Sequence, residues 1–176
     1  MGEVELEALL ADFDDHVQRA QAGLDAQRRH AATFRTLVED WLGPLLETVA
    51  GRLERSGHEA EVHLDAGLTM PEPALPTHHA ELRFTPRALP GQRMVRPKDR
   101  QPLVRFQLDA VEGVVRVWAR DVSLDGRDVL VGYRNDTDGM PLGIELAAFD
   151  QDQAWKHILE TLSFALRDSA QESLFE

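Results

Sequence analysis

Cysteine is absent from the 176 residues of this chain. Its absence excludes disulfide bonds, thiolate metal sites and cysteine nucleophiles. No apolar run is long enough to span a bilayer. The first fifteen residues, MGEVELEALLADFDD, include six acidic and no basic residues, whereas a secretory signal begins with a basic segment followed by an apolar one. We therefore expect a cytoplasmic protein without a membrane partner.

Basic residues are scarce, because 19 Lys and Arg stand against 31 Asp and Glu, a net charge of -12. This charge opposes binding to nucleic acid. One segment reverses the sign: residues 83–105 hold seven basic residues against Asp99 alone, a net +6. The most closely spaced of these cations are Arg93, Arg96, Lys98 and Arg100. We expect this basic loop to bind an acidic protein segment or a phosphate-bearing ligand. The alternative is a surface loop that only balances the acidic remainder.

Apolar side chains recur every seven residues near the start of the chain. One series is Leu6, Phe13, Ala20, Gln27, Phe34 and Trp41, and the other is Leu10, Val17, Leu24, Ala31, Val38 and Leu45. Apart from Gln27 this is a heptad seam, and it predicts one amphipathic helix over residues 3–42. Gly43-Pro44 predicts a kink or a restart of the helix. A second helix is expected to about Ser56, with Gly57 ending it.

The period changes to two after residue 58, which predicts β-strands. Strands are expected over residues 60–68, 80–84, 103–109, 114–122 and 129–134, with a sixth possible over 144–149. Asp150 then precedes an amphipathic helix, and Gln153 completes a capping-box pattern. The order predicts an α+β fold: a long kinked helix, an antiparallel meander of five to six strands, and a C-terminal helix packed on the sheet. We divide the chain into a helical arm that serves as a coiled-coil-like dimerisation segment (1–57) and an antiparallel sheet with its C-terminal helix (58–176), and we expect the two to form one structural unit.

The predicted first helix is longer than the sheet that it could cover. Forty helical residues span about 60 Å, whereas strands of seven residues span about 25 Å. The excess apolar surface must therefore be buried against a second copy, a partner protein or the C-terminal helix. The seam residues predicted to mediate dimerisation are Leu6, Leu10, Phe13, Val17, Leu24, Phe34, Val38 and Trp41.

Charged residues beside the seam indicate the direction of pairing. Position e of the heptad is acidic in the first half (Glu7, Asp14) and basic in the second (Arg28, Arg35). In an antiparallel pair, e faces e, so Glu7 would meet Arg35 of the second chain. We therefore expect an antiparallel homodimer centred near Gln21. Such pairs select the orientation more than they add affinity.

Two patterns have the residue types of a metal site. Residues 134–145 match part of an EF-hand loop, but Arg134 occupies the first ligand position, so an Asp-Gly turn fits better. Residues Glu59, Glu61, His63 and Asp65 share one strand face, with His78 and His79 nearby. Same-face side chains on a strand are nearly 7 Å apart, too far to converge on one ion. We therefore predict no metal site, no cofactor and no catalytic residues.

These observations favour a non-enzymatic protein-interaction module: a dimeric adaptor, a regulatory subunit or a chaperone-like protein. The first alternative is a small-molecule sensor, with Trp118, Tyr133 and Trp155 lining its pocket. The second is a metal-dependent hydrolase that uses the face from Glu59 to Asp65 with His78 or His79. Besides a second copy, we expect another protein as partner.

Overall fold

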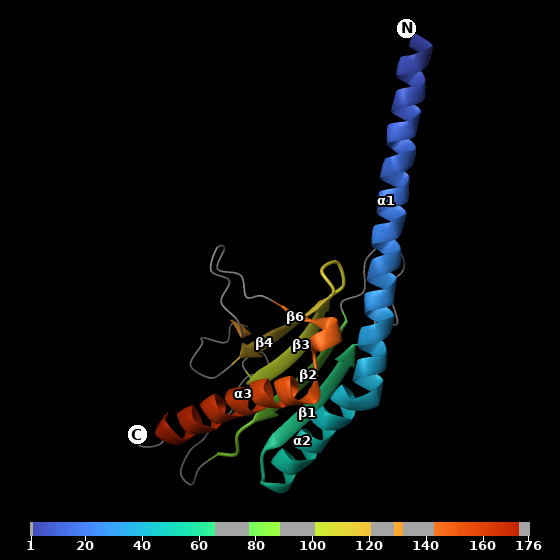
Figure 1. The fold of residues 1–176 in the computed structure, drawn as a ribbon. Helices are drawn as coiled ribbons and strands as arrows, with labels where there is room; N and C mark the ends of the chain where they lie inside the picture. The colour runs from blue at the N-terminus through green and yellow to red at the C-terminus, as the bar shows by residue number, and fades with distance from the viewer. Residues whose placement is uncertain (1, 66–77, 89–100, 121–128, 132–142, 173–176) are drawn as a thin grey trace.

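A computed structural model shows a long helix that rises away from a sheet packed against two further helical segments (Figure 1). It describes residues 2–65, 78–88, 101–120, 129–131 and 143–172. The basic loop residues Arg93, Arg96, Lys98 and Arg100 lie outside these ranges, as does the partial EF-hand pattern up to residue 142. Within the described ranges, no helix is both long and apolar enough to cross a membrane.

The predicted interruption at Gly43-Pro44 is confirmed, although the helix does not break there. Helix α1 (Gly2–Leu37) continues through a π-helical turn, η1 (Val38–Leu42), into α2 (Gly43–Arg55). Pro44 has no N–H to donate to the preceding turn, and the N–H of Gly43 donates to the carbonyl of Val38. The chain therefore keeps a helical path with one wider turn, and the axis bends there (Figure 1).

Helix α2 ends at Arg55 and is capped by Ser56 and Gly57, close to the predicted end. Gly57 has a φ of 84°, a conformation that glycine adopts without strain. Its N–H donates to the carbonyl of Glu54 at 2.9 Å, and that of His58 donates to Leu53 at 3.0 Å. These two bonds form a Schellman motif, which satisfies carbonyls at the helix end and turns the chain directly into the first strand.

The sheet is an antiparallel meander in the order β1-β2-β3-β4-β5. Its strands are β1 (Glu59–Asp65), β2 (His79–Thr85), β3 (Leu103–Asp109), β4 (Val114–Arg120) and β5 (Val129–Val131). A two-residue strand, β6 (Ile144–Glu145), pairs with the start of β4. The sixth strand is thus shorter than the predicted 144–149, because the chain turns into the 3₁₀-helix η3 (Leu146–Ala148).

One hydrophobic core joins the helices to a single face of the sheet. Helix α2 lies against β1 and β2, and α3 (Gln151–Glu172) contacts β3 and β4. The alternating residues Leu82, Val104, Phe106 and Val117 point into the core, where Phe34, Leu42, Leu46 and Ile158 meet them. This cluster contains residues from both predicted segments. The end of α1, the turn η1, helix α2 and the sheet therefore form one structural unit.

Helix α3 begins where the sequence predicted. The side chain of Asp150 accepts a hydrogen bond from the N–H of Gln153 at 2.9 Å, as an N-cap residue does. The reciprocal half of the capping box is not formed, since the side-chain oxygen of Gln153 is buried without a hydrogen-bond partner. A single cap therefore starts this helix.

Candidate interaction surface

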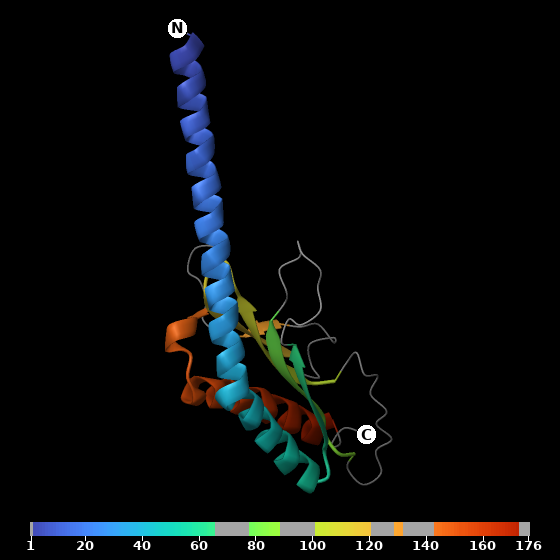
Figure 2. The ribbon, with the colours of Figure 1, turned by 90° about the vertical axis from the view of Figure 1, so that its right-hand side faces the viewer.

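The N-terminal part of α1 projects beyond the sheet and carries exposed apolar side chains. In both views this arm rises away from the strands and the other helices (Figures 1 and 2). The exposed fractions of Leu6, Leu9, Leu10, Phe13, Val17 and Leu24 lie between 44% and 67%. These six residues, called the arm seam below, form an apolar stripe that no described residue of the chain buries. Because large exposed apolar patches are uncommon on soluble monomers, the arm seam is the candidate interaction surface.

The seam changes its environment along the helix. Phe34 and Val38 are 1% and 8% exposed and belong to the chain's own core. Trp41 is half-buried, with its ring 5.5 Å from that of Phe149. The structure therefore separates the eight residues predicted to mediate dimerisation. Leu6, Leu10, Phe13, Val17 and Leu24 are open to a partner, whereas Phe34 and Val38 are already covered.

The base of the arm is attached to the sheet by the turn between β3 and β4. The ring of His30 bonds through Nδ1 to the carbonyl of Ala110 at 2.8 Å. Gly113 lies beside this ring, and a Cβ there would come within 2.7 Å of it. Gly113 also has a φ of 68°, so it is required both by the turn and by the close approach of the helix. The arm N-terminal to this attachment projects from the body.

The predicted register of the dimer does not fit this arrangement. Pairing centred near Gln21 would place Leu6 and Leu10 of the second chain against Val38 and Phe34. Both positions face the sheet, so a second helix would occupy the space that the sheet fills. Arg35 also lines a pocket at the base of the helix. Any self-pairing must therefore use the arm seam alone.

The outer face of the sheet contains a buried carboxylate held by two arginines. Glu81 on β2 is fully buried, and it accepts hydrogen bonds from Arg83 and from Arg105 on β3. Burial alone would raise the pKa of Glu81, but the hydrogen bonds and charges of both arginines outweigh it and hold the pKa below its usual value. This side chain is therefore an ionised structural group near neutral pH.

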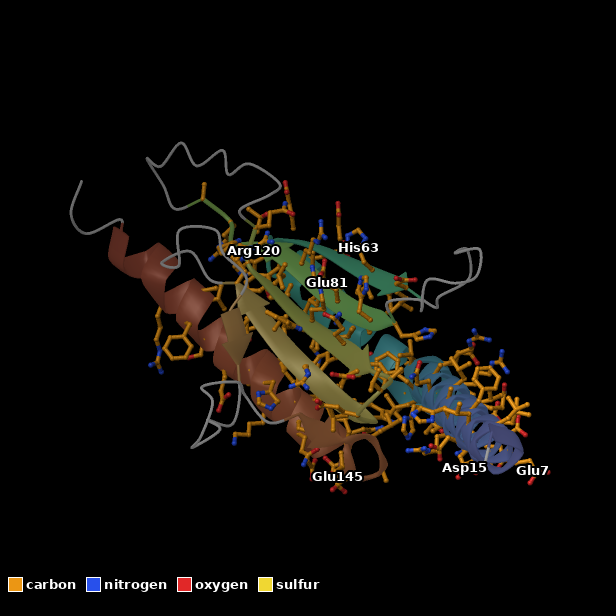
Figure 3. The ribbon with its side chains drawn as sticks, turned by 90° about the horizontal axis from the view of Figure 1, so that it is seen from above. Glu7, Asp15, His63, Glu81, Arg120 and Glu145 are labelled. Carbon is orange, nitrogen blue, oxygen red and sulfur yellow. The ribbon has the colours of Figure 1, made fainter. Side chains whose placement is uncertain are left out.

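The residues of the hydrolase hypothesis lie beside this group but do not converge. His63 is 3.3 Å from Glu61 on the same strand, and His79 is 3.6 Å from Asp65 across the strand pair. Figure 3 shows His63, Glu81 and Arg120 on the side of the sheet away from α3. Among the residues that the structure describes, no three His, Asp or Glu side chains are placed to hold a metal ion. The described geometry offers this hypothesis no site.

The aromatic residues of the sensor hypothesis do not share a pocket either. Trp118 lies opposite Arg105 on the outer face of the sheet, whereas Trp155 packs on the core side. Tyr133 is outside the described residues. A pocket among the described residues lies elsewhere, at the bend between α1 and α2, and neither Trp118 nor Trp155 lines it. Sequence periodicity could not predict this pocket, because helical residues from both sides of the bend, the end of β1 and His78 form it together.

Comparisons with known proteins give no further guide, since no family model, curated protein or solved structure matches the chain.

Proposed function

We propose that this chain is a non-enzymatic, dimeric protein-interaction module, whose two copies associate in antiparallel orientation through the arm seam. The observation that carries the proposal is the exposure of six large apolar side chains on a helix that extends past its own sheet. Removing such side chains from water is the main favourable term in protein association. The seam also has the seven-residue spacing that pairs helices.

An antiparallel pair centred on Asp15 uses only exposed seam positions. Leu6 then faces Leu24 of the second arm, Leu10 faces Ala20, and Phe13 faces Val17. Each layer joins one position a to one position d, as antiparallel coiled coils require. Large residues meet smaller ones in the two inner layers, so the helices can approach closely. This register leaves Phe34 and Val38 in their own core.

The flanking positions complete this register. On one side, Leu9 reaches Gly23 of the second arm, where the helix has open space and no side chain. On the other side, Glu7 meets Gln21 of the second arm. Asp14 meets its own copy at the centre, which is the one unfavourable contact. Exposed pairs of this kind contribute well under about 1 kcal/mol each, so the apolar layers dominate the affinity.

Such a dimer would hold two identical sheet bodies at opposite ends of a paired helix. His30 marks the base of each arm, and the two bases would be about 45 Å apart. Each body would keep its outer sheet face and α3 exposed to other molecules. This geometry suits an adaptor or a regulatory subunit that presents two equivalent surfaces, and it requires no catalytic group.

Solution mass by multi-angle light scattering tests the proposal. We expect the wild type to be a dimer at micromolar concentration, and the double variant Phe13→Glu, Val17→Glu to be a folded monomer. The matched control is Phe164→Glu with Val111→Glu, because these apolar residues are equally exposed but lie on α3 and on the β3–β4 turn. A monomeric wild type would refute the proposal, and so would a control variant that dissociates to the same extent.

A further inference from the structure

A pocket of about 290 Å³ lies at the bend between α1 and α2, beside the end of β1. Phe34, Val38 and Leu64 form its apolar wall. Leu64 is 47% exposed, although the alternation of β1 directs it toward the helices. The wider turn η1 borders the same space. Gly43, directly after this turn, has no side chain and so lets Leu64 lie close to the helix, because a Cβ on Gly43 would be only 3.3 Å from the Leu64 side chain. Ligand pockets begin at about this volume, and π-helical turns are frequent at functional sites.

A buried histidine with an unpaired ring nitrogen is among the residues that line this pocket. His78 is 3% exposed and lines the pocket. Its Nε2 is buried, and no hydrogen-bond partner for it exists among the described residues. Burial first, and the nearby charge of Arg35 second, lower the pKa of His78 below its ordinary value, against an opposing effect of Asp65. The ring is therefore neutral near pH 7 and has one nitrogen that accepts a hydrogen bond.

The charged residues around the pocket are mainly acidic. Glu39, Glu47 and Asp65 line it together with one cation, Arg35. The charge of Asp65 offsets that of Arg35, which leaves two negative charges. Both remaining carboxylates are exposed. The pocket thus combines an apolar wall, a buried histidine and a negative rim.

We propose that this pocket binds a small organic amine, a molecule with an apolar body and an ammonium group. The apolar body would contact Phe34, Val38 and Leu64. The ammonium would lie at the rim, where the carboxylates of Glu39 and Glu47 attract it. An ammonium has three donors and no acceptor, which suits a rim of carboxylates. This binding would be independent of the pairing of the arms.

Isothermal calorimetry on the full chain with n-hexylamine, n-hexanol and n-hexanoate tests the proposal, because these probes share an apolar body and differ only in their polar end. We expect hexylamine to bind most tightly and hexanoate most weakly. The double variant Glu39→Gln, Glu47→Gln should weaken hexylamine by roughly three- to tenfold and leave hexanol unchanged. The arm variant Phe13→Glu, Val17→Glu should bind hexylamine as the wild type does.

The matched control is Glu54→Gln with Asp152→Asn, which removes the same charge from exposed positions on α2 and α3. It should change hexylamine binding less than twofold. An equal loss in this control would overturn the proposal, because it would show diffuse attraction to an acidic protein. Equal or tighter binding of hexanoate, or no binding of hexylamine in the millimolar range, would also overturn it. As a second readout, hexylamine should shift the NMR signals of the His78 ring and the Leu64 methyl groups in the wild type.

Discussion

The two halves of the first helix have the same heptad pattern but opposite environments. Leu10, Phe13 and Val17 are half or more exposed, whereas Phe34 and Val38 are almost completely buried. The difference comes from what lies beside each half: the seven-residue strands end before the helix does. A heptad pattern thus predicts which face of a helix is buried, but it does not reveal which molecule covers that face. The uncovered half is where a partner can be sought.

The largest expected effect is the difference in stability between an alanine substitution in the buried half and one in the exposed half. Phe34→Ala should lower the free energy of unfolding by about 3–5 kcal/mol, because it leaves a cavity in a packed core. Phe13→Ala should change it by less than about 1 kcal/mol when both are measured in the Val17→Glu background, where pairing of the arms is blocked. Urea unfolding followed by circular dichroism gives both values. Similar losses at the two positions would contradict the comparison.

The junction between the halves provides a second test. A Cβ at Gly43 would come within 2.8 Å of the carbonyl oxygen of Val38, so Gly43→Ala should destabilise the protein by about 1–3 kcal/mol. Gly51→Ala on α2 is the matched control, since its nearest neighbour is the end of the Arg55 side chain at 3.9 Å. It should stabilise by up to about 1 kcal/mol, because alanine favours a helix. Thermal unfolding should give opposite signs, and a stabilising Gly43→Ala would disprove the steric account of the bend.

A smaller effect concerns the flank of the arm alone. Asp14 would meet its own copy across the proposed dimer axis, so Asp14→Asn should tighten self-association by roughly two- to threefold. Asp15→Asn removes the same charge at a position that faces away from the seam, and it should leave the dissociation constant nearly unchanged. Sedimentation equilibrium of both variants measures the difference. An equal gain from Asp15→Asn would indicate a general charge effect instead.

A graded effect of pH on stability should come from three histidines and one glutamate in the body of the molecule. Burial lowers the pKa of His58, His78 and His157 in the folded chain. The folded state then binds fewer protons than the unfolded one, so this contribution to stability is complete above pH 6.5 and declines as the pH falls below it. The pKa of Glu81 is also lowered, so its protonation should cause a further loss of stability below pH 4.5.

Urea unfolding between pH 8 and pH 4 tests whether the free energy of unfolding falls as the pH is lowered. His157→Gln should flatten the slope around pH 6, since both ring nitrogens of His157 are buried without a hydrogen bond and only Glu160, at 3.6 Å, favours its charged form. If the protein became more stable on acidification from pH 8 to pH 5.5, protonation of these histidines would stabilise the folded state, which would contradict this prediction.

Much of the fold follows from local patterns. The heptad predicted the helix, alternation predicted the strands, and Gly57 and Asp150 marked a helix end and a helix start. Those signals depend on neighbours in sequence, which is why they could be found in the chain alone. The short β6 could not, because Leu146 and Phe149 are drawn into the core by helix packing and not by alternation.

The candidate sites were less predictable, because they depend on contacts between distant segments. Phe34 and Val38 looked identical to Phe13 and Val17 until the position of the sheet divided them. Glu81 gave no signal of its own, since its arginine partners come from two strands. The pocket at His78 requires a bent helix beside the end of β1. The roles of the basic loop residues stay a prediction.

The most direct test of the central claim is disulfide cross-linking, which is simple here because the chain has no cysteine of its own. Leu6→Cys and Leu24→Cys are prepared separately, oxidised alone and then oxidised after mixing. In the proposed antiparallel pair, the two copies of residue 6 are about 27 Å apart along the axis, and residue 6 faces residue 24. We predict a covalent dimer only in the mixture. A dimer of Leu6→Cys alone, or no cross-link in the mixture, would contradict antiparallel pairing through the arm.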